Sequence, residues 1–266
     1  MAQRKMTVAD IRALKGKRQL TMLYVETLEE ARAAAAANID MLSIIAPLWN
    51  EEMREAAGNC FVQVGLLYGE LVTTEDYLRA AHAAIKIGGD CVYCAAGLNT
   101  VAALAHEGIP VIGHVGLIPS KCTWTGGFRA VGKTASTAMD IWKDVQALEK
   151  AGAFGAEFEV VPTKVATEIA KRSSLVLLSM GAGPGADAQY LFAEDVLGCT
   201  RGHRPRHAKT YADFASEHET LQRKRTDAFA SFKADVDSGN YPGDEHQVPI
   251  KDEEFDDFLK LFEAEN

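Results

Sequence analysis

The sequence has few of the features that mark secreted, membrane or redox proteins. Its five cysteines are irregularly spaced through 266 residues, which is not the pattern of a disulfide framework. No apolar run approaches the roughly 20 residues that span a bilayer. The N-terminal segment also lacks the apolar core of a signal peptide. We therefore expect a cytoplasmic protein with no membrane partner.

Positive charge is scarce as well. The chain has 28 Lys and Arg against 37 Asp and Glu, a formal net charge of −9. This balance argues against a nucleic-acid partner, since such domains carry basic surfaces. Two nucleotide-binding motifs are missing: no Gly-x-Gly-x-x-Gly follows the first predicted strand, and "GAGPGADAQ" lacks the lysine and Ser/Thr of a P-loop.

What the sequence does contain is a regular alternation of short apolar runs and amphipathic segments, from Leu20 to about Leu197. Seven or eight βα units predict a parallel sheet, and eight close a (β/α)8 TIM barrel; a doubly wound open sheet is the alternative. The predicted strands are Leu20–Val25, Met41–Ile45, Phe61–Leu66, Cys91–Cys94, Val111–Val115, Ala156–Val160, Leu175–Ser179 and, more weakly, Tyr190–Phe192. The predicted helices are Leu28–Ala37, Thr74–Ile87, Thr100–Glu107, Ala135–Ala151 and Lys164–Arg172.

The pattern changes after Gly198. A basic, irregular stretch at Arg201–Lys209 precedes one long predicted helix, Tyr211–Asp237, and a short acidic helix from Phe255. No linker is evident. We therefore predict a single domain over residues 1–266, with a barrel at about 18–198 and a helical C-terminal extension at about 210–264.

Candidate catalytic residues stand where the predicted strands end, because TIM barrels carry their sites at that edge. His114 and Glu159 are the two candidates for proton transfer. Side chains alternate along a strand, so Glu157 shares a face with Glu159 and lies one layer deeper. Two carboxylates this close do not both ionise cheaply, and the pKa of one should rise. A salt bridge in the barrel floor, or an outward-facing Glu157, is the alternative.

The "CVYC" segment invites a metal or redox interpretation. Cys91 and Cys94 are three residues apart in a predicted strand and so face opposite sides. This placement argues against joint ligation of a metal.

Long stretches of the chain resemble one enzyme family. "IPVIGHVGLIPSKCTWTGGFRAVGKT", "DVQALEKAGAFGAEFEVVPTKVATEIAKR" and "GAGPGADAQYLFAEDVLG" are similar to the ketopantoate hydroxymethyltransferase family, and the resemblance covers nearly the whole chain. It implies a TIM barrel of the phosphoenolpyruvate/pyruvate superfamily. Enzymes of that family transfer a one-carbon unit from methylenetetrahydrofolate to the enolate of 2-oxoisovalerate with Mg²⁺, and they tend to form homo-oligomers.

The resemblance also exposes departures from the family pattern. The family's two metal aspartates correspond to Ala46 and Gly65, and its substrate lysine and glutamate to Tyr93 and Ala95. Alanine and glycine offer none of the side-chain oxygens that Mg²⁺ prefers. We therefore expect no metal ligands and no cofactor, with Mg²⁺ or tetrahydrofolate bound only if the family reaction is retained.

Several further residues are candidates for contacts with a ligand. Tyr93 can hydrogen-bond a carbonyl, and Glu26 can hold half of a metal site or serve the start of a helix. Ser179 and Gly181, in the strand-seven turn, can line the pocket. Lys121, Arg129 and Lys133 can recognise an anion, or else form a solvated surface or subunit contact.

These observations favour a metal-independent enzyme that performs enolate-type carbon–carbon chemistry, as a transferase, lyase or isomerase, on a small carbonyl compound. Glu159 would move the proton while His114 or Tyr93 holds the oxygen. One alternative is Mg²⁺-dependent hydroxymethyl transfer to 2-oxoisovalerate in pantothenate synthesis, with the metal at Glu26, Glu157 and Glu159. The other is a non-catalytic binding or assembly protein. A homo-oligomer is expected.

Overall fold

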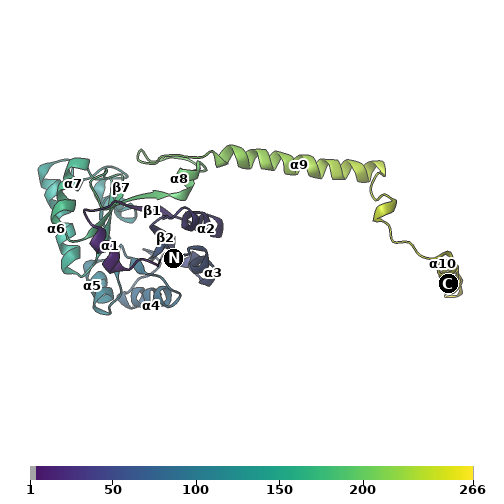
Figure 1. The fold of residues 1–266 in the computed structure, drawn as a ribbon, viewed down its shortest axis with the longest axis horizontal. Helices are drawn as coiled ribbons and strands as arrows, with labels where there is room; N and C mark the ends of the chain where they lie inside the picture. The colour runs from purple at the N-terminus through teal and green to yellow at the C-terminus, as the bar shows by residue number, and fades with distance from the viewer. Residues whose placement is uncertain (1–3, 266) are drawn as a thin grey trace. The chain divides into compact units, whose positions relative to one another are not determined.

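Eight parallel strands close into a barrel in the computed structural model, which describes residues 4–265 (Figure 1). Each strand pairs with the next, and the last pairs with the first. The closed barrel confirms the (β/α)8 prediction and excludes the open doubly wound sheet. The strands are β1 (Leu20–Tyr24), β2 (Met41–Ile45), β3 (Phe61–Gly65), β4 (Cys91–Tyr93), β5 (Val111–Gly116), β6 (Gly155–Glu159), β7 (Val176–Met180) and β8 (Ala188–Phe192).

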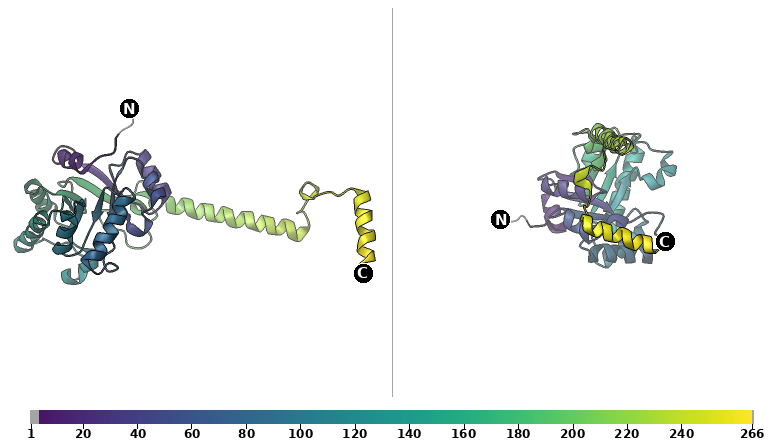
Figure 2. Two further views of the ribbon diagram at one scale, coloured as in Figure 1. Left: turned by 90° about the horizontal axis from the view of Figure 1, so that it is seen from below. Right: turned by 90° about the vertical axis from the view of Figure 1, so that its right-hand side faces the viewer.

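Helices surround the strands, as the views in Figures 1 and 2 show. Four of them, α1, α2, α4 and α6, begin at a threonine whose hydroxyl accepts a hydrogen bond from the third helical amide, in a capping box. The helices of this part are α1 (Val8–Leu14), α2 (Leu28–Ala36), α3 (Glu51–Ala56), α4 (Thr74–Lys86), α5 (Leu98–His106), α6 (Ala135–Lys150), α7 (Thr163–Arg172) and α8 (Ala193–Leu197), with 3-10 turns η1 (Ala46–Leu48) and η2 (Pro119–Thr125).

Alternation along the strands divides the core into two layers. One apolar cluster lies between strands and helices and includes Phe158 and Cys94, while the other fills the barrel interior and includes Phe61 and Cys91. The two cysteines therefore face opposite sides, as the strand pattern predicts. Full burial of a large apolar side chain such as Phe61 contributes roughly 1.5–3 kcal/mol.

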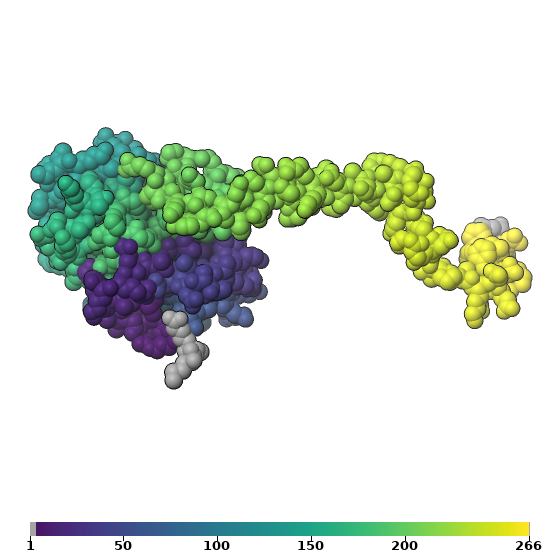
Figure 3. Space-filling view, turned by 45° about the horizontal axis from the view of Figure 1, so that its top comes forward, coloured from purple at the N-terminus to yellow at the C-terminus, as the bar shows by residue number. Residues whose placement is uncertain are grey.

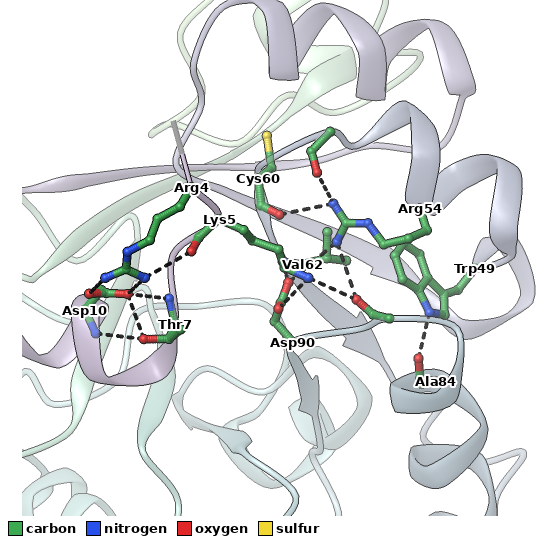
Figure 4. A network of polar contacts seen from close by, with 12 residues as sticks. Arg4, Lys5, Thr7, Asp10, Trp49, Arg54, Cys60, Val62, Ala84 and Asp90 are labelled. Carbon is green, nitrogen blue, oxygen red and sulfur yellow. Dashed lines mark hydrogen bonds and ion pairs between the residues drawn. The ribbon is translucent and has the colours of Figure 1, made fainter. Parts of the chain in front are cut away.

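The N-terminal segment forms ion pairs with aspartates that directly precede strands of the barrel. Lys5 Nζ lies 2.7 Å from Asp90 Oδ1, just before β4, and Asp90 Oδ2 accepts a 2.8 Å hydrogen bond from the Val62 amide (Figure 4). Two further ion pairs continue this pattern: Lys15–Asp187 at 2.6 Å before β8, and Arg18–Asp40 at 2.7 Å before β2. Figure 3 shows the purple N-terminal segment packed beside the blue segment that follows it.

The chain divides into two compact units, one ending at Ala212 and one beginning at Asp213. The second unit contains the helices α9 (Phe214–Ser238) and α10 (Asp252–Ala264), with the 3-10 turn η3 (Asp244–His246) between them. No residue of α9 or α10 is buried. That the two units act as a single domain stays a prediction. None of the helices in the described range has the length and apolar character needed to cross a membrane.

Candidate functional site

The C-terminal ends of the strands surround a cavity of about 450 Å³, here called the barrel-mouth cavity. Its walls come from inward-facing residues of the strands and from the loops that follow them. The charged groups on its lining are the carboxylates of Glu26, Glu30, Glu157, Glu159 and Glu194, beside the imidazole of His114; no lysine or arginine of the described chain lines it. The cavity is therefore acidic.

His114 forms the centre of a buried polar cluster. Its Nε2 lies 2.8 Å from the carbonyl oxygen of Leu117, which only accepts, so Nε2 carries the hydrogen. Its Nδ1 lies 2.8 Å from the hydroxyl of Tyr93. In a neutral imidazole Nδ1 is then the acceptor and Tyr93 donates. In the imidazolium, Nδ1 donates to Tyr93 and the phenol hydrogen becomes free for a ligand oxygen.

The two glutamates of β6 flank this imidazole. Glu157 Oε2 lies 3.5 Å from Nδ1 of His114, and Glu159 Oε2 lies 3.2 Å from Nε2. Register explains the contact, since His114 pairs with Glu157 across β5 and β6. Both glutamates are buried and both line the barrel-mouth cavity. Thus neither glutamate faces the helices.

Further polar side chains, which the sequence patterns did not single out, surround Glu157, the deeper of the two glutamates. Gln63 of β3 donates to Glu157 Oε1 at 2.8 Å and to the Ser43 hydroxyl at 3.1 Å. Tyr190 of β8 also hydrogen-bonds Ser43. Ser43 and Gln63 are polar residues at inward-facing positions of otherwise apolar strands. The alternation of side chains along a strand is the sequence signal that would have identified them.

Burial changes the acidity of the cluster. Desolvation raises the pKa of Glu157 to about 7, with the charge of Glu159 adding to the rise, while His114 and the Gln63 hydrogen bond oppose it. The pKa of Tyr93 is raised well above its ordinary value, chiefly by burial and then by the charge of Glu157. The cluster therefore holds a carboxyl group that titrates near neutrality beside a phenol that stays protonated.

Glu159 differs from Glu157 in having a free oxygen. Its Oε2 is inaccessible to solvent and makes no hydrogen bond among the described residues, because the nearby Nε2–H of His114 points to Leu117. The next residue, Val160, has φ of 49°, a left-handed conformation that a β-branched residue rarely adopts. The strained backbone of Val160 therefore directly follows Glu159, whose Oε2 has no hydrogen-bond donor among the described residues.

The remaining predicted site residues fall into two groups. Glu26, Gly65 and Ala95 line the barrel-mouth cavity, and Glu26 accepts a 2.9 Å hydrogen bond from the Tyr24 hydroxyl. Ala46 and Ser179 do not line it, contrary to expectation. Ile45 takes the inward position, so Ala46 begins η1 and packs against the outer core.

Ser179 faces outward because it pairs in register with Phe158, a residue of the outer cluster. Its hydroxyl donates to the Gly183 carbonyl at 3.0 Å and accepts from the Ala182 amide at 3.2 Å, so it shapes the β7–β8 turn. Gly181 lines a second cavity, described below. Lys121 donates to the Ala95 carbonyl at 2.6 Å.

The residues of the barrel mouth do not fit a divalent cation. At the ends of β2 and β3, Ala46 and Gly65 have no side-chain oxygen. Gln63 and His114 engage Glu157, and no group of three or more His, Cys, Asp or Glu in the described range is arranged to hold a metal ion. The arrangement suits proton transfer between buried groups.

Comparison with known proteins finds relatives across the chain. A family model described as ketopantoate hydroxymethyltransferase matches residues 48–244. The chain is 33% identical over 264 residues to 3-methyl-2-oxobutanoate hydroxymethyltransferase of Thermus thermophilus, covering 90% of this chain and 98% of that protein. It is 31% identical over 291 residues to the protein of that name from Nitratidesulfovibrio vulgaris, covering 96% of this chain and 89% of the relative.

Solved structures share the fold at low sequence identity. One is 2,3-dimethylmalate lyase, a member of the PEP mutase/isocitrate lyase superfamily, with a TM-score of 0.50 and 15% identity over 96% of this chain and 99% of that chain. Another is phosphoenolpyruvate phosphomutase from Streptomyces platensis subsp. rosaceus, with a TM-score of 0.51 and 12% identity over 97% of this chain and 99% of that one.

Proposed function

Since this chain belongs to the ketopantoate hydroxymethyltransferase family, we propose that it is an enzyme that makes an enolate from a small carbonyl compound and forms or breaks a carbon–carbon bond there, without a divalent ion. Transfer, lyase and isomerase reactions all pass through such an enolate. The family membership supports an enzyme, and the chemistry of the cavity residues supports this narrower reading.

One observation carries the proposal: Glu159 lines the barrel-mouth cavity, and its Oε2 has no hydrogen-bond donor among the described residues. A carboxylate that faces a bound ligand and has an oxygen that no protein donor occupies is placed to act as a general base. A carbon acid that occupies the cavity therefore offers its proton to the carboxylate of Glu159.

Removal of the proton places negative charge on the carbonyl oxygen, and a hydrogen-bond donor is needed there to stabilise it. Tyr93 supplies it when His114 is protonated, because Nδ1–H then donates to the phenol and frees its hydrogen. The C–H bond breaks, the proton goes to Glu159, and the electron pair moves to the oxygen held by Tyr93. Glu157 lies beside this pair and can take or return a proton near neutral pH.

Solvent exchange of the substrate's α-hydrogen tests the proposal. The protein is incubated in deuterium oxide with a panel of small ketones and 2-oxo acids, 2-oxoisovalerate among them, and loss of the α-proton signal is followed by NMR. We expect catalysed exchange with at least one compound, and a loss of about 10²–10⁴-fold in the Glu159→Gln variant.

The control is Glu107→Gln, which removes an exposed carboxylate outside the cavity lining and should keep the rate. Undiminished exchange in Glu159→Gln would overturn the proposal. No exchange with any compound would support the non-catalytic alternative. A rate that depends on added Mg²⁺ or Mn²⁺ would support the family reaction instead.

A further inference from the structure

A second cavity, here called the side cavity, adjoins the barrel mouth. It has a volume of about 590 Å³ and lies between the loop that follows β5 and the segment 203–207. Pro119, Glu159, Met180 and Phe192 line both cavities. Both volumes fall in the range typical of small-molecule sites. A ligand in the side cavity can therefore reach Glu159, the residue that we assign to proton transfer.

The two cavities differ in charge. The side cavity is lined by Arg129, Lys133 and Arg206, whereas the barrel-mouth cavity has five carboxylates and neither lysine nor arginine in the described chain. None of these three cations forms an ion pair with a carboxylate in the part of the chain that the structure describes. An anionic group is therefore repelled from the barrel mouth and attracted to the side cavity.

The carboxylates of the side cavity do not neutralise it. One is Glu159, which faces both cavities, and the other is Asp195, which is buried and accepts a 2.6 Å hydrogen bond from the Thr200 hydroxyl. Phe128 and Phe192 add aromatic surface beside the cations. The lining thus combines unpaired positive charge with apolar walls, which suits an organic anion better than a free inorganic ion.

One wall of the side cavity is fixed by close packing. Gly181 has φ of 74°, and the His207 ring lies where a side chain at this position would stand. Only glycine allows both the left-handed backbone and this approach of the ring. The packing holds the segment that carries Arg206 against the end of β7, beside Glu159.

We propose that the side cavity binds the anionic end, a carboxylate or a phosphate, of a carbonyl compound whose reactive carbon lies at Glu159. This inference rests on the proposed function for the reactive end and extends it to the class of substrate. In such a substrate the anionic group is not adjacent to the reactive carbonyl, because the anionic group lies in the side cavity and the carbonyl lies in the barrel-mouth cavity.

Direct binding tests the site without requiring turnover. The full chain is titrated calorimetrically with glutarate, with inorganic phosphate and with the neutral analogue glutaramide. We expect saturable binding of at least one anion and none of glutaramide. Arg206→Gln and the double variant Arg129→Gln/Lys133→Gln should each weaken binding by about tenfold, the size of a lost charge-assisted hydrogen bond.

Arg204→Gln is the matched control, because Arg204 belongs to the same segment, lies outside the cavity lining and bonds the Thr210 hydroxyl. It should bind as the parent does. Binding of glutarate alone identifies a carboxylate site, and binding of phosphate alone identifies a phosphate site. No saturable anion binding, or equal losses in Arg204→Gln and Arg206→Gln, would overturn the inference. If anions bind but Glu159→Gln exchanges the α-hydrogen as fast as the parent, the proposed function is wrong and the anion site stands.

Discussion

At the scale of single residues, Glu157 lies in an environment very different from that of a free side chain in water. It is a carboxyl group inside a barrel, held by an amide from the opposite wall and flanked by an imidazole. Its folded pKa of about 7 stands above the ordinary value of 4.5, chiefly because burial penalises the charge. Burial of this group therefore costs stability whenever it ionises.

We predict that Glu157→Gln stabilises the protein at neutral and alkaline pH. Between about pH 4.5 and about 7 the unfolded chain ionises while the folded protein keeps its proton, so wild-type stability falls as pH rises. The variant has no such loss and should gain about 3 kcal/mol over this range, then stay constant. Urea denaturation at a series of pH values measures the difference.

The control for this prediction is Glu168→Gln, on the surface of α7. The pKa of Glu168 is lowered to about 2 by its bonds to Arg172 and Lys171, so its effect belongs to acid pH, below about 4.5. Equal pH profiles for wild type and Glu157→Gln would show that Glu157 is hydrated or paired more strongly than its contacts indicate.

Part of the site follows from sequence and part does not. Strand alternation alone places Glu157 and Glu159 on one face, and the end of β5 presents His114 beside them. Contacts across the barrel, such as Gln63 to Glu157, depend on the register of strands far apart in sequence. Likewise, the path of the irregular segment that brings His207 to Gly181 is set by tertiary packing, which no local pattern encodes.

Among the elements, β5 and β6 meet most closely at Gly116. Gly116 has φ of 92°, and a side chain there would collide with the carbonyl oxygen of Glu159. The same carbonyl accepts a 2.9 Å hydrogen bond from the Leu117 amide. Glycine at this position therefore fixes how the end of β6 presents its carboxylate.

We predict that Gly116→Ala lowers both stability and exchange activity. The left-handed backbone alone costs an alanine about 1–2 kcal/mol, and the collision with the β6 backbone adds to it. The control is Gly108→Ala, where φ is 76° but nothing stands within 4 Å of the new methyl group. Thermal unfolding and the deuterium exchange assay should show the larger loss for Gly116→Ala; equal losses would remove the role assigned to the contact.

Most elements of the barrel are predictable because each strand is a short apolar run bounded by turns. Even the weak eighth strand is present, extended to Ala188–Phe192 by pairing with β1 along its full length. The helices that sequence patterns miss are α1, α3 and α8, of seven, six and five residues. Such helices are too short to show a 3.6-residue period, and they form because the barrel holds their ends.

At the scale of the whole molecule, the two units differ in how they are stabilised. The barrel has an extensive buried core, whereas α9 and α10 bury no residue. Exposed apolar side chains recur on both helices, among them Phe229 and Phe232 on α9 and Phe258 and Leu259 on α10. Helices with so little packing are marginal on their own. We therefore propose that a second copy of the chain covers them.

Hydrogen exchange tests this association. Amide protection in α9 and α10 should rise with protein concentration, while protection of the barrel strands stays the same, because the strands are buried within one chain. Phe258→Glu should abolish the concentration dependence, and Lys260→Gln, nearby on α10, serves as the control because it also lowers the net charge by one. Protection that is independent of concentration would argue against the homo-oligomer.

The ion pairs of the N-terminal segment have a consequence for how this scaffold tolerates change. Lys5, Lys15 and Arg18 all meet aspartates that stand just before a strand begins. The barrel-mouth cavity lies at the opposite rim, where TIM barrels carry their sites, so these ion pairs are separate from the cavity lining. Residues at the rim can therefore be replaced without breaking the ion pairs at the base of the barrel.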